Sequence, residues 1–261
     1  MPAAAGAGSA VMTRKATQAL ALLRVVKDVR RSAGGERPVA VGGARELVPL
    51  LAKELRAGGD AGAVTESART DAAALVWIGP ADEDALRAAS RAATPIVGVT
   101  EGESLPYVLD TNLVRLAAGR GLPVAEIAIA LACVLGVEGA GLAARLPVLR
   151  EAVIGELIES CARQNGLIGA AVFVPGVDLP ILTMNEARMV LRIALANGRE
   201  LDSDLWPEVL AIVGAAFGLR RIAAELLDLL PVAGWMVKGG VAYSGTRAIG
   251  EAARQRFDTT A

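Results

Sequence analysis

Ala73-Ala-Leu-Val-Trp-Ile78, ended by Gly79-Pro80, predicts a short buried β-strand. Pro38-Val-Ala-Val-Gly42 and Pro95-Ile-Val-Gly-Val99 are similar apolar runs, and Ala61 to Thr65 is a weaker one. These runs alternate with segments of helical pattern, which is typical of parallel strands joined by right-handed crossovers. The sequence therefore predicts a small doubly wound α/β sheet over residues 35–120.

Two helices are expected between these strands. One covers about residues 44–57 and ends at Gly58-Gly59, because paired glycines are common just after a helix. The other begins at Asp82-Glu-Asp84 and runs to about Ala93. Grouped carboxylates suit a metal ion, but consecutive helical residues point in different directions, so we interpret these three as helix-start charges.

A helical half is predicted for residues 122–258, where the strand-like runs stop. Val124 to Leu135 is its first helix, and Pro147 lies where the next helix should begin. Asn165-Gly166 is expected to end that second helix, and Leu167 to Val174 to form a separate apolar segment. Thr183-Met-Asn-Glu186 has the spacing of a capping box and should open a later helix.

Glycines are frequent in the last predicted helix, from Val232 to about Phe257. Glycine inside a helix costs about 1 kcal/mol relative to alanine, so close backbone packing or a break is expected there. The helix carries five of them: Gly234, Gly239, Gly240, Gly245 and Gly250.

The composition excludes several kinds of chemistry. The 261 residues include no histidine, which removes Ser-His-Asp catalysis and histidine-ligated zinc. The two cysteines, Cys133 and Cys161, have apolar neighbours and are predicted to be buried reduced thiols. With 27 Lys and Arg against 28 Asp and Glu, nucleic-acid binding is not expected. Hydrophobic residues make up 53%, but aromatic ones only 3%, which favours Ala- and Gly-rich helices.

The amino terminus predicts a flexible tail over residues 1–10 and a basic amphipathic helix over residues 11–33. Val11 to Arg37 holds seven basic and two acidic residues. Such a helix lies on an anionic membrane or docks on the protein. Asp60 to Asp110, with nine acidic and three basic residues, offers a docking partner.

A membrane-spanning anchor is not expected. The longest charge-free stretch after the tail, Gln164 to Val177, is shorter than the roughly 20 apolar residues that cross a bilayer. Peripheral attachment and short apolar hairpins remain open.

A nucleotide site in such a sheet would use Gly42, Gly43 and Arg45, which follow the first strand. A phosphate-binding loop needs a lysine and a hydroxyl, which are both missing here, and Glu46 adds negative charge. The two glycines are therefore interpreted mainly as a tight turn. Asp110 to Asn112, after a possible strand at Leu105 to Val108, receives no role.

Basic side chains interrupt the apolar surfaces of the helical half and are candidates for lipid or partner binding. Arg188 and Arg192 share a helix face because they are four residues apart. Pairing with Glu186, Glu225, Asp228 or Glu251 is the alternative. The full candidate set is Arg188, Arg192, Arg220, Arg221, Lys238 and Arg247.

Residues 150–257 resemble a GTPase-associated helical domain that includes the YcjF-type inner-membrane proteins and has been compared with Tic20-like membrane proteins. The resemblance rests on these runs: Asn165-Gly166, Pro175-Gly-Val-Asp-Leu-Pro180, Leu182-Thr-Met-Asn185, Arg188-Met-Val-Leu-Arg192, Gly218-Leu-Arg220, Pro231-Val-Ala-Gly234, Val241-Ala242 and Thr246-Arg-Ala-Ile-Gly250.

The resemblance implies that the preceding half is a degenerate Ras- or Era-like GTPase domain. Gly42-Gly-Ala-Arg45 stands where the phosphate-binding loop should be, and Val99-Thr-Glu-Gly102 replaces the guanine-reading motif. No catalysis carries over from the family, and neither a metal nor a cofactor is expected.

Three functional hypotheses follow. The leading one is a non-enzymatic, membrane-associated or scaffold protein at the cytoplasmic face of the cell membrane, which binds a protein partner or anionic lipid. The second is a nucleotide-responsive switch that lacks the standard loop. The third is a soluble homo-oligomer that buries its apolar helices between subunits.

Overall fold

The structure is a computed structural model that describes residues 25–32, 37–102, 104–117, 119, 121–171, 179–202, 205, 207–214 and 235–258. The predicted tail, residues 11–24 of the predicted basic helix, Arg220 and Arg221 lie outside these ranges.

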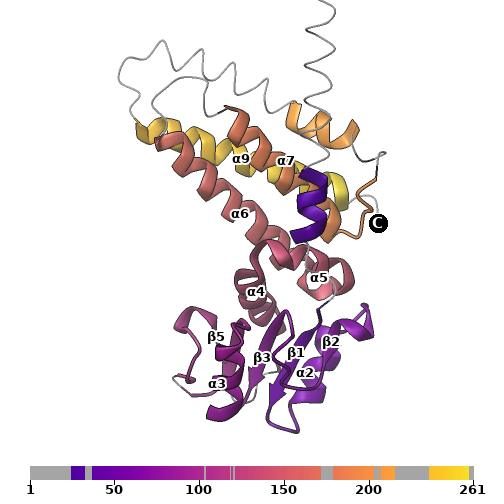
Figure 1. Cartoon of the computed structure of the whole chain (residues 1–261), viewed down its shortest axis with the longest axis vertical. Helices are drawn as coiled ribbons and strands as arrows, with labels where there is room; N and C mark the ends of the chain where they lie inside the picture. Colours follow the sequence, from indigo (N-terminus) through magenta and orange to yellow (C-terminus); the bar gives the residue numbers. More distant parts are fainter. Residues whose placement is uncertain are drawn as a thin grey trace, which may run out of the picture.

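The first half of the described chain is a five-stranded parallel sheet, which confirms the predicted α/β class (Figure 1). Its spatial order is β2-β1-β3-β4-β5, the order of flavodoxin-type doubly wound sheets. Helix α2 connects β1 to β2, and α3 connects β3 to β4. The bounds are β1 Val39–Gly43, α2 Val48–Leu55, β2 Val64–Thr65, β3 Ala74–Ile78, α3 Glu83–Arg91, β4 Ile96–Thr100 and β5 Leu113–Arg115.

Helices cover both faces of the sheet. Since successive side chains of a strand point to opposite sides, each strand contributes to two separate cores. On β3, Val76 and Ile78 belong to the core that includes α2, whereas Leu75 and Trp77 belong to a second core that includes Leu86 of α3. All five residues of β3 are buried. This two-sided burial explains why the strand appears in the sequence as a continuous apolar run.

The sheet half differs from the sequence prediction in its connections. Residues 44–47 form a turn, so α2 begins later than expected. Ala61–Ala63 is a 3-10 turn capped by Asp60, and only Val64–Thr65 pairs with β1.

The predicted strand at Leu105 to Val108 is absent from the described residues, and β5 instead begins at Leu113. The side chains of Leu105, Val108 and Leu113 fill the space above Gly98. Leu105 to Val108 therefore packs across β4 instead of pairing with it. The polar turn Asp110–Asn112 leads into β5 and does not follow a strand.

The second half is helical, and α6, α7 and α9 form its main body (Figure 1). The predictions for α4 and for Pro147 as the first residue of α6 are confirmed, whereas α5 was not predicted. The bounds are α4 Val124–Leu135, α5 Gly139–Arg145, α6 Pro147–Ala171, α7 Leu179–Ala196 and α9 Trp235–Asp258, with residues 207–214 also helical.

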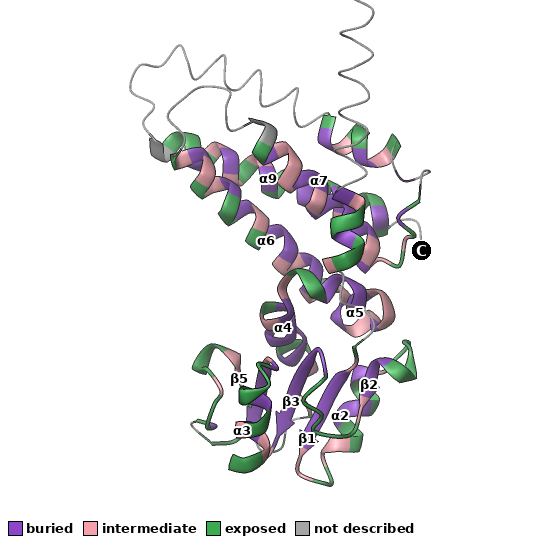
Figure 2. Ribbon diagram, in the orientation of Figure 1, coloured by how far each residue is buried: buried purple, intermediate pink, exposed green. Residues whose placement is uncertain are grey.

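Helix α4 joins the two halves. It contacts β3, β4 and β5 on one side and α6 on the other. Ile127 and Leu131 are completely buried in a hydrophobic core that extends from the sheet into the helical half (Figure 2). The stretch Val124–Arg145 is long and apolar enough to cross a membrane by length and composition, and 61% of its most apolar window is buried inside the protein.

The predicted helix boundaries at Asn165-Gly166 and Thr183 are wrong. Helix α6 continues through Asn165 to Ala171, and α7 begins at Leu179, before Thr183. Asn165 is fully buried and bonded to neighbouring helices, so it does not cap a helix end. Glu186, the expected capping carboxylate, is buried in the middle of α7.

Glycines bring α6 and α9 into close backbone contact, one of the two outcomes that the sequence left open. A Cβ atom on Gly169 would lie 2.8 Å from Cβ of Ala242, and one on Gly239 would lie 3.0 Å from the Gly166 carbonyl oxygen. Farther along, a Cβ atom on Gly250 would lie 2.6 Å from Cγ1 of Ile158. The absence of side chains at these positions allows the two helices to pack along most of their length.

Candidate functional site

The first candidate region is the carboxyl edge of the sheet, where Gly42 and Gly43 end β1. Gly43 has φ +122°, and a Cβ atom there would lie 2.0 Å from the carbonyl oxygen of Ile78. The amide of Ala44 donates to that same oxygen at 2.7 Å. The loop therefore uses this amide to close the turn against β3, whereas phosphate-binding loops point such amides at a ligand.

A shallow cleft lies beside this turn, with Arg45 as the basic side chain among its lining residues. Glu66 and Asp82 also line it, so carboxylates outnumber the arginine. The Trp77 ring lies against Gly42, and a Cβ atom on Gly42 would approach it to 3.1 Å. These residues do not form a cradle for phosphate groups.

The acidic run at the start of α3 has a structural role. The side chain of Asp82 accepts hydrogen bonds from the amides of Asp84 and Ala85, both at 3.1 Å, as an N-cap does. Glu83 and Asp84 pair with Arg87 one turn later. Among the described residues there is no cluster of three or more side chains able to hold a metal ion.

The second candidate region is the face of α7 that carries Arg188 and Arg192. A docked N-terminal helix, residues 25–32, packs against it and buries Val25 and Val29 in the shared core. Asp28 lies 3.6 Å from the guanidinium of Arg188. The described part of the basic helix therefore docks on the helical half, not on the acidic segment from Asp60 to Asp110.

Two more polar contacts hold this docked helix. Arg192 donates from Nη2 to the hydroxyl of Ser32 at 3.3 Å, and Arg30 donates to the carbonyl of Leu201. Arg192 is partly buried, and burial together with the nearby charge of Arg188 lowers its pKa. Predicted partners Glu225 and Asp228 lie outside the described residues.

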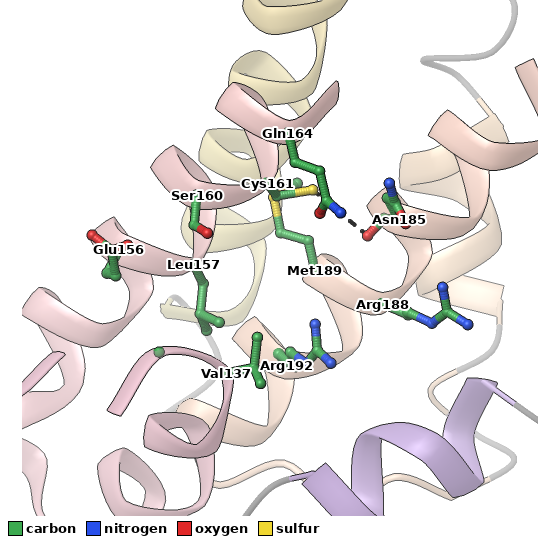
Figure 3. A pocket seen from close by; sticks show the side chains of 11 residues that line it. Val137, Glu156, Leu157, Ser160, Cys161, Gln164, Asn185, Arg188, Met189 and Arg192 are labelled. Carbon is green, nitrogen blue, oxygen red and sulfur yellow. Dashed lines mark hydrogen bonds between the residues drawn. The ribbon is translucent and has the colours of Figure 1, made fainter. Parts of the chain in front are cut away.

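A cleft between α6 and α7 opens beside Arg192 (Figure 3). Its apolar floor includes Leu157 and Met189, and Ser160 and Gln164 of α6 are its exposed polar residues. The cleft has a volume of about 70 Å³.

The remaining basic candidates are not brought together with Arg188 and Arg192. Arg247 lies 4.0 Å from the carboxylate of Glu159, which also accepts a hydrogen bond from Tyr243 at 2.9 Å. Lys238 is exposed near the start of α9.

A buried polar network, which was not predicted from the sequence, links α6, α7 and α9. Asn165 donates to the hydroxyl of Thr246 at 2.9 Å, which donates to the carboxylate of Glu186 at 2.8 Å. Asn185 donates to the side-chain oxygen of Asn165 at 2.9 Å. The sequence feature that could have predicted this network is the presence of polar residues on the apolar faces of long helices. A polar group that is buried there without a partner is costly.

The prediction that both cysteines are buried is wrong for Cys133, which is exposed, whereas Cys161 is partly buried. Partial burial and the neighbouring Glu156 carboxylate raise the pKa of the Cys133 thiol. A raised pKa disfavours the reactive thiolate, so the surroundings of Cys133 do not activate it as a nucleophile.

No protein-family model, curated protein or solved structure matches this chain.

Proposed function

We propose that the protein is a non-enzymatic binding module that associates with an anionic membrane surface through the helical half. The single observation that carries the proposal is the exposed apolar end of the α6–α9 pair. Leu167 is 72% exposed and Val237 is 44% exposed, and Lys238 adds a positive charge next to Val237. Apolar side chains beside a lysine are typical of a protein surface that contacts lipid headgroups.

The close packing of α6 and α9 places these side chains together. Gly166 and Gly169 face α9, so Leu167 between them points elsewhere and stays exposed. The first turn of α7 adds Ile181, which is 49% exposed. We define the apolar end as Leu167, Ile181 and Val237. The end of α6 and the starts of α7 and α9, which carry these residues, lie far from the sheet (Figure 2).

The sheet half supports a non-catalytic role. Its loop amide at Ala44 bonds to Ile78, and Trp77 occupies the space in front of Gly42. The degenerate GTPase character and the GTPase-associated helical family remain part of this proposal. They favour a membrane-proximal scaffold whose α/β half offers a face to a protein partner.

The proposed association is peripheral. The apolar stretch Val124–Arg145 packs between the sheet and α6, so it is needed for the fold. Attachment by the exposed end of α6 and α9 leaves this core intact.

Liposome flotation of the full chain tests the proposal. We expect flotation with anionic but not with neutral liposomes, and its loss in the double variant Leu167→Glu/Val237→Glu. The matched control is Ile129→Glu/Leu210→Glu, which changes two other exposed apolar residues, 56% and 53% exposed, elsewhere on the surface. Equal flotation of both double variants, or none for the unmodified chain, would contradict attachment through this end.

A further inference from the structure

We propose that the cleft between α6 and α7 is a binding site for a small oxyanion, a phosphate or a carboxylate group, with Arg192 as its principal ligand. This site is separate from the apolar end proposed to contact the membrane. It goes beyond the proposed function because it assigns the chain a small-molecule ligand.

Among the residues that the structure describes, Arg192 is the charged group lining this cleft that forms no ion pair. Asp28 pairs with Arg188 at 3.6 Å, and Glu156, which also lines the cleft, lies 3.4 Å from Arg163. Within the described ranges, Arg192 has no carboxylate within ion-pair distance, and its hydrogen bond to Ser32 is long. A partly buried cation without a counter-ion is costly in a folded protein.

The Nε atom of Arg192 gives a second, independent observation. It is buried and has no hydrogen-bond partner in the described part of the chain. Buried guanidinium N–H groups are usually bonded, because an unpaired one loses its hydration without replacement. An oxyanion supplies what is missing, since its oxygens accept from the planar guanidinium fork and neutralise its charge.

The cleft suits a ligand of this size and chemistry. Its volume of about 70 Å³ is roughly that of two water molecules, enough for one phosphate or carboxylate group. Ser160 and Gln164 place a hydroxyl and an amide on the opposite wall (Figure 3). Leu157 and Met189 form an apolar floor, and charge-assisted hydrogen bonds beside apolar side chains are stronger than in water.

Arg188 has a different position. Figure 3 shows its guanidinium directed away from Ser160 and Gln164. Its ion pair with Asp28 belongs to the docked N-terminal helix. We therefore assign anion contact to Arg192 and a supporting positive charge to Arg188.

Thermal unfolding and titration calorimetry of the full chain test the site, with inorganic phosphate as the probe and chloride at equal ionic strength as the reference. We expect phosphate to raise the unfolding midpoint, and Arg192→Gln to weaken phosphate binding at least about tenfold, as loss of a charge-assisted hydrogen bond does. The control is Arg91→Gln, an exposed arginine in the last turn of α3 in the sheet half, which should change binding less than about twofold.

Two further measurements distinguish a phosphate-binding role of Arg192 from a purely structural one. Without phosphate, Arg192→Gln should be at least as stable as the unmodified chain, whereas a purely structural arginine predicts lower stability. Gln164→Leu, at an exposed position, should weaken phosphate binding about threefold without affecting the fold.

Vesicles separate the possible sources of the anion. The ligand is a lipid headgroup if the chain binds phosphatidic acid vesicles, free phosphate abolishes this binding, and Leu167→Glu/Val237→Glu leaves it intact. If the chain binds free phosphate but not these vesicles, the ligand is a soluble anion. An equal phosphate response in the unmodified chain and in Arg192→Gln, or no response in either, would overturn the proposal.

Discussion

Glycine serves different purposes in the sheet half and in the helical half. In the sheet half, Gly43 and Gly79 have positive φ values of 122° and 104° and make tight turns at strand ends. In the helical half, Gly169, Gly239 and Gly250 lie inside helices, where the absence of a side chain lets α6 and α9 approach each other. Glycine therefore ends strands in the sheet half, whereas in the helical half it both ends helices, at Gly136 and Gly198, and allows α6 and α9 to pack closely.

The two halves also differ in how their buried polar residues are arranged. Among the described residues of the sheet half, the buried polar ones are Thr94, which precedes β4, and Thr100, which ends it. In the helical half Asn165, Glu186 and Thr246 lie in the centre of three packed helices and bond to one another. A hydrogen-bonded centre of this kind fixes the relative position of helices whose Ala- and Gly-rich surfaces specify it weakly.

The largest expected effect concerns the turn glycine of the sheet. Gly43→Ala should destabilise the protein by about 4 kcal/mol, because it adds a strained backbone to a clash with the Ile78 carbonyl. Urea unfolding measures this change. Gly58→Ala, with φ +69° and open space around the new Cβ atom, is the control and should cost about 1 kcal/mol. Similar values for both variants would contradict the close approach of β1 to β3.

A second pair of variants tests the packing glycines. Gly250→Ala should cost about 3 kcal/mol, because its Cβ atom would overlap Ile158, whose branched side chain has little freedom to move. Gly240→Ala lies in the same helix with no atom within 4 Å, and should stabilise by about 1 kcal/mol through helix propensity. Thermal unfolding measures both changes in stability. If both variants were stabilised, or both destabilised, the close packing of α6 against α9 would be refuted.

The buried polar network supplies the third prediction. Thr246→Val preserves the side-chain shape but removes the hydroxyl that accepts from Asn165 and donates to Glu186. We expect a loss of about 2 kcal/mol in chemical unfolding, because two buried groups lose a partner. Ser244→Ala, which removes an exposed hydroxyl two residues earlier in the same helix, should stay within about 0.5 kcal/mol. A neutral Thr246→Val would mean that the network contributes no stability.

The smallest effect concerns the contact between the two halves at Asp60. Arg145 of α5, helped by the Gly62 amide, lowers the pKa of this carboxyl below its usual 3.8. Its contribution to stability is therefore present above about pH 4 and is lost as the pH falls through the lowered pKa. Asp60→Asn should reduce stability slightly at about pH 6, and its difference from the unmodified chain should shrink as the pH falls below 3.8, as urea unfolding at several pH values can establish. A difference that does not depend on pH would argue against this ion pair.

Sequence reasoning predicted the sheet half better than the helical half, and the glycines explain the difference. Gly79-Pro80 marked the end of β3 correctly, because breakers lie between short strands. Asn165-Gly166 has the same local character, yet it lies inside α6, since packing against α9 and bonds to Thr246 outweigh local propensity. Only the tertiary structure distinguishes these two uses.

The candidate sites show a similar limit. The four-residue spacing of Arg188 and Arg192 predicted a shared helix face, and both do line one cleft. Their contacts with Asp28 and Ser32 depend on a segment about 160 residues away in sequence, which spacing rules cannot identify. Likewise, the donation from Ala44 to Ile78 that closes the predicted nucleotide loop becomes visible only in the folded sheet.

The central claim is that the helical half binds anionic membranes and that the sheet half does not bind nucleotide. Hydrogen–deuterium exchange of the full chain tests it most directly, measured with anionic vesicles and separately with GTP and GDP plus magnesium. The account predicts slower exchange with vesicles at residues 166–171 and 237–241, and no change at residues 42–49 with either nucleotide. Nucleotide-dependent protection of residues 42–49, without any protection of the α6–α9 end by vesicles, would contradict it.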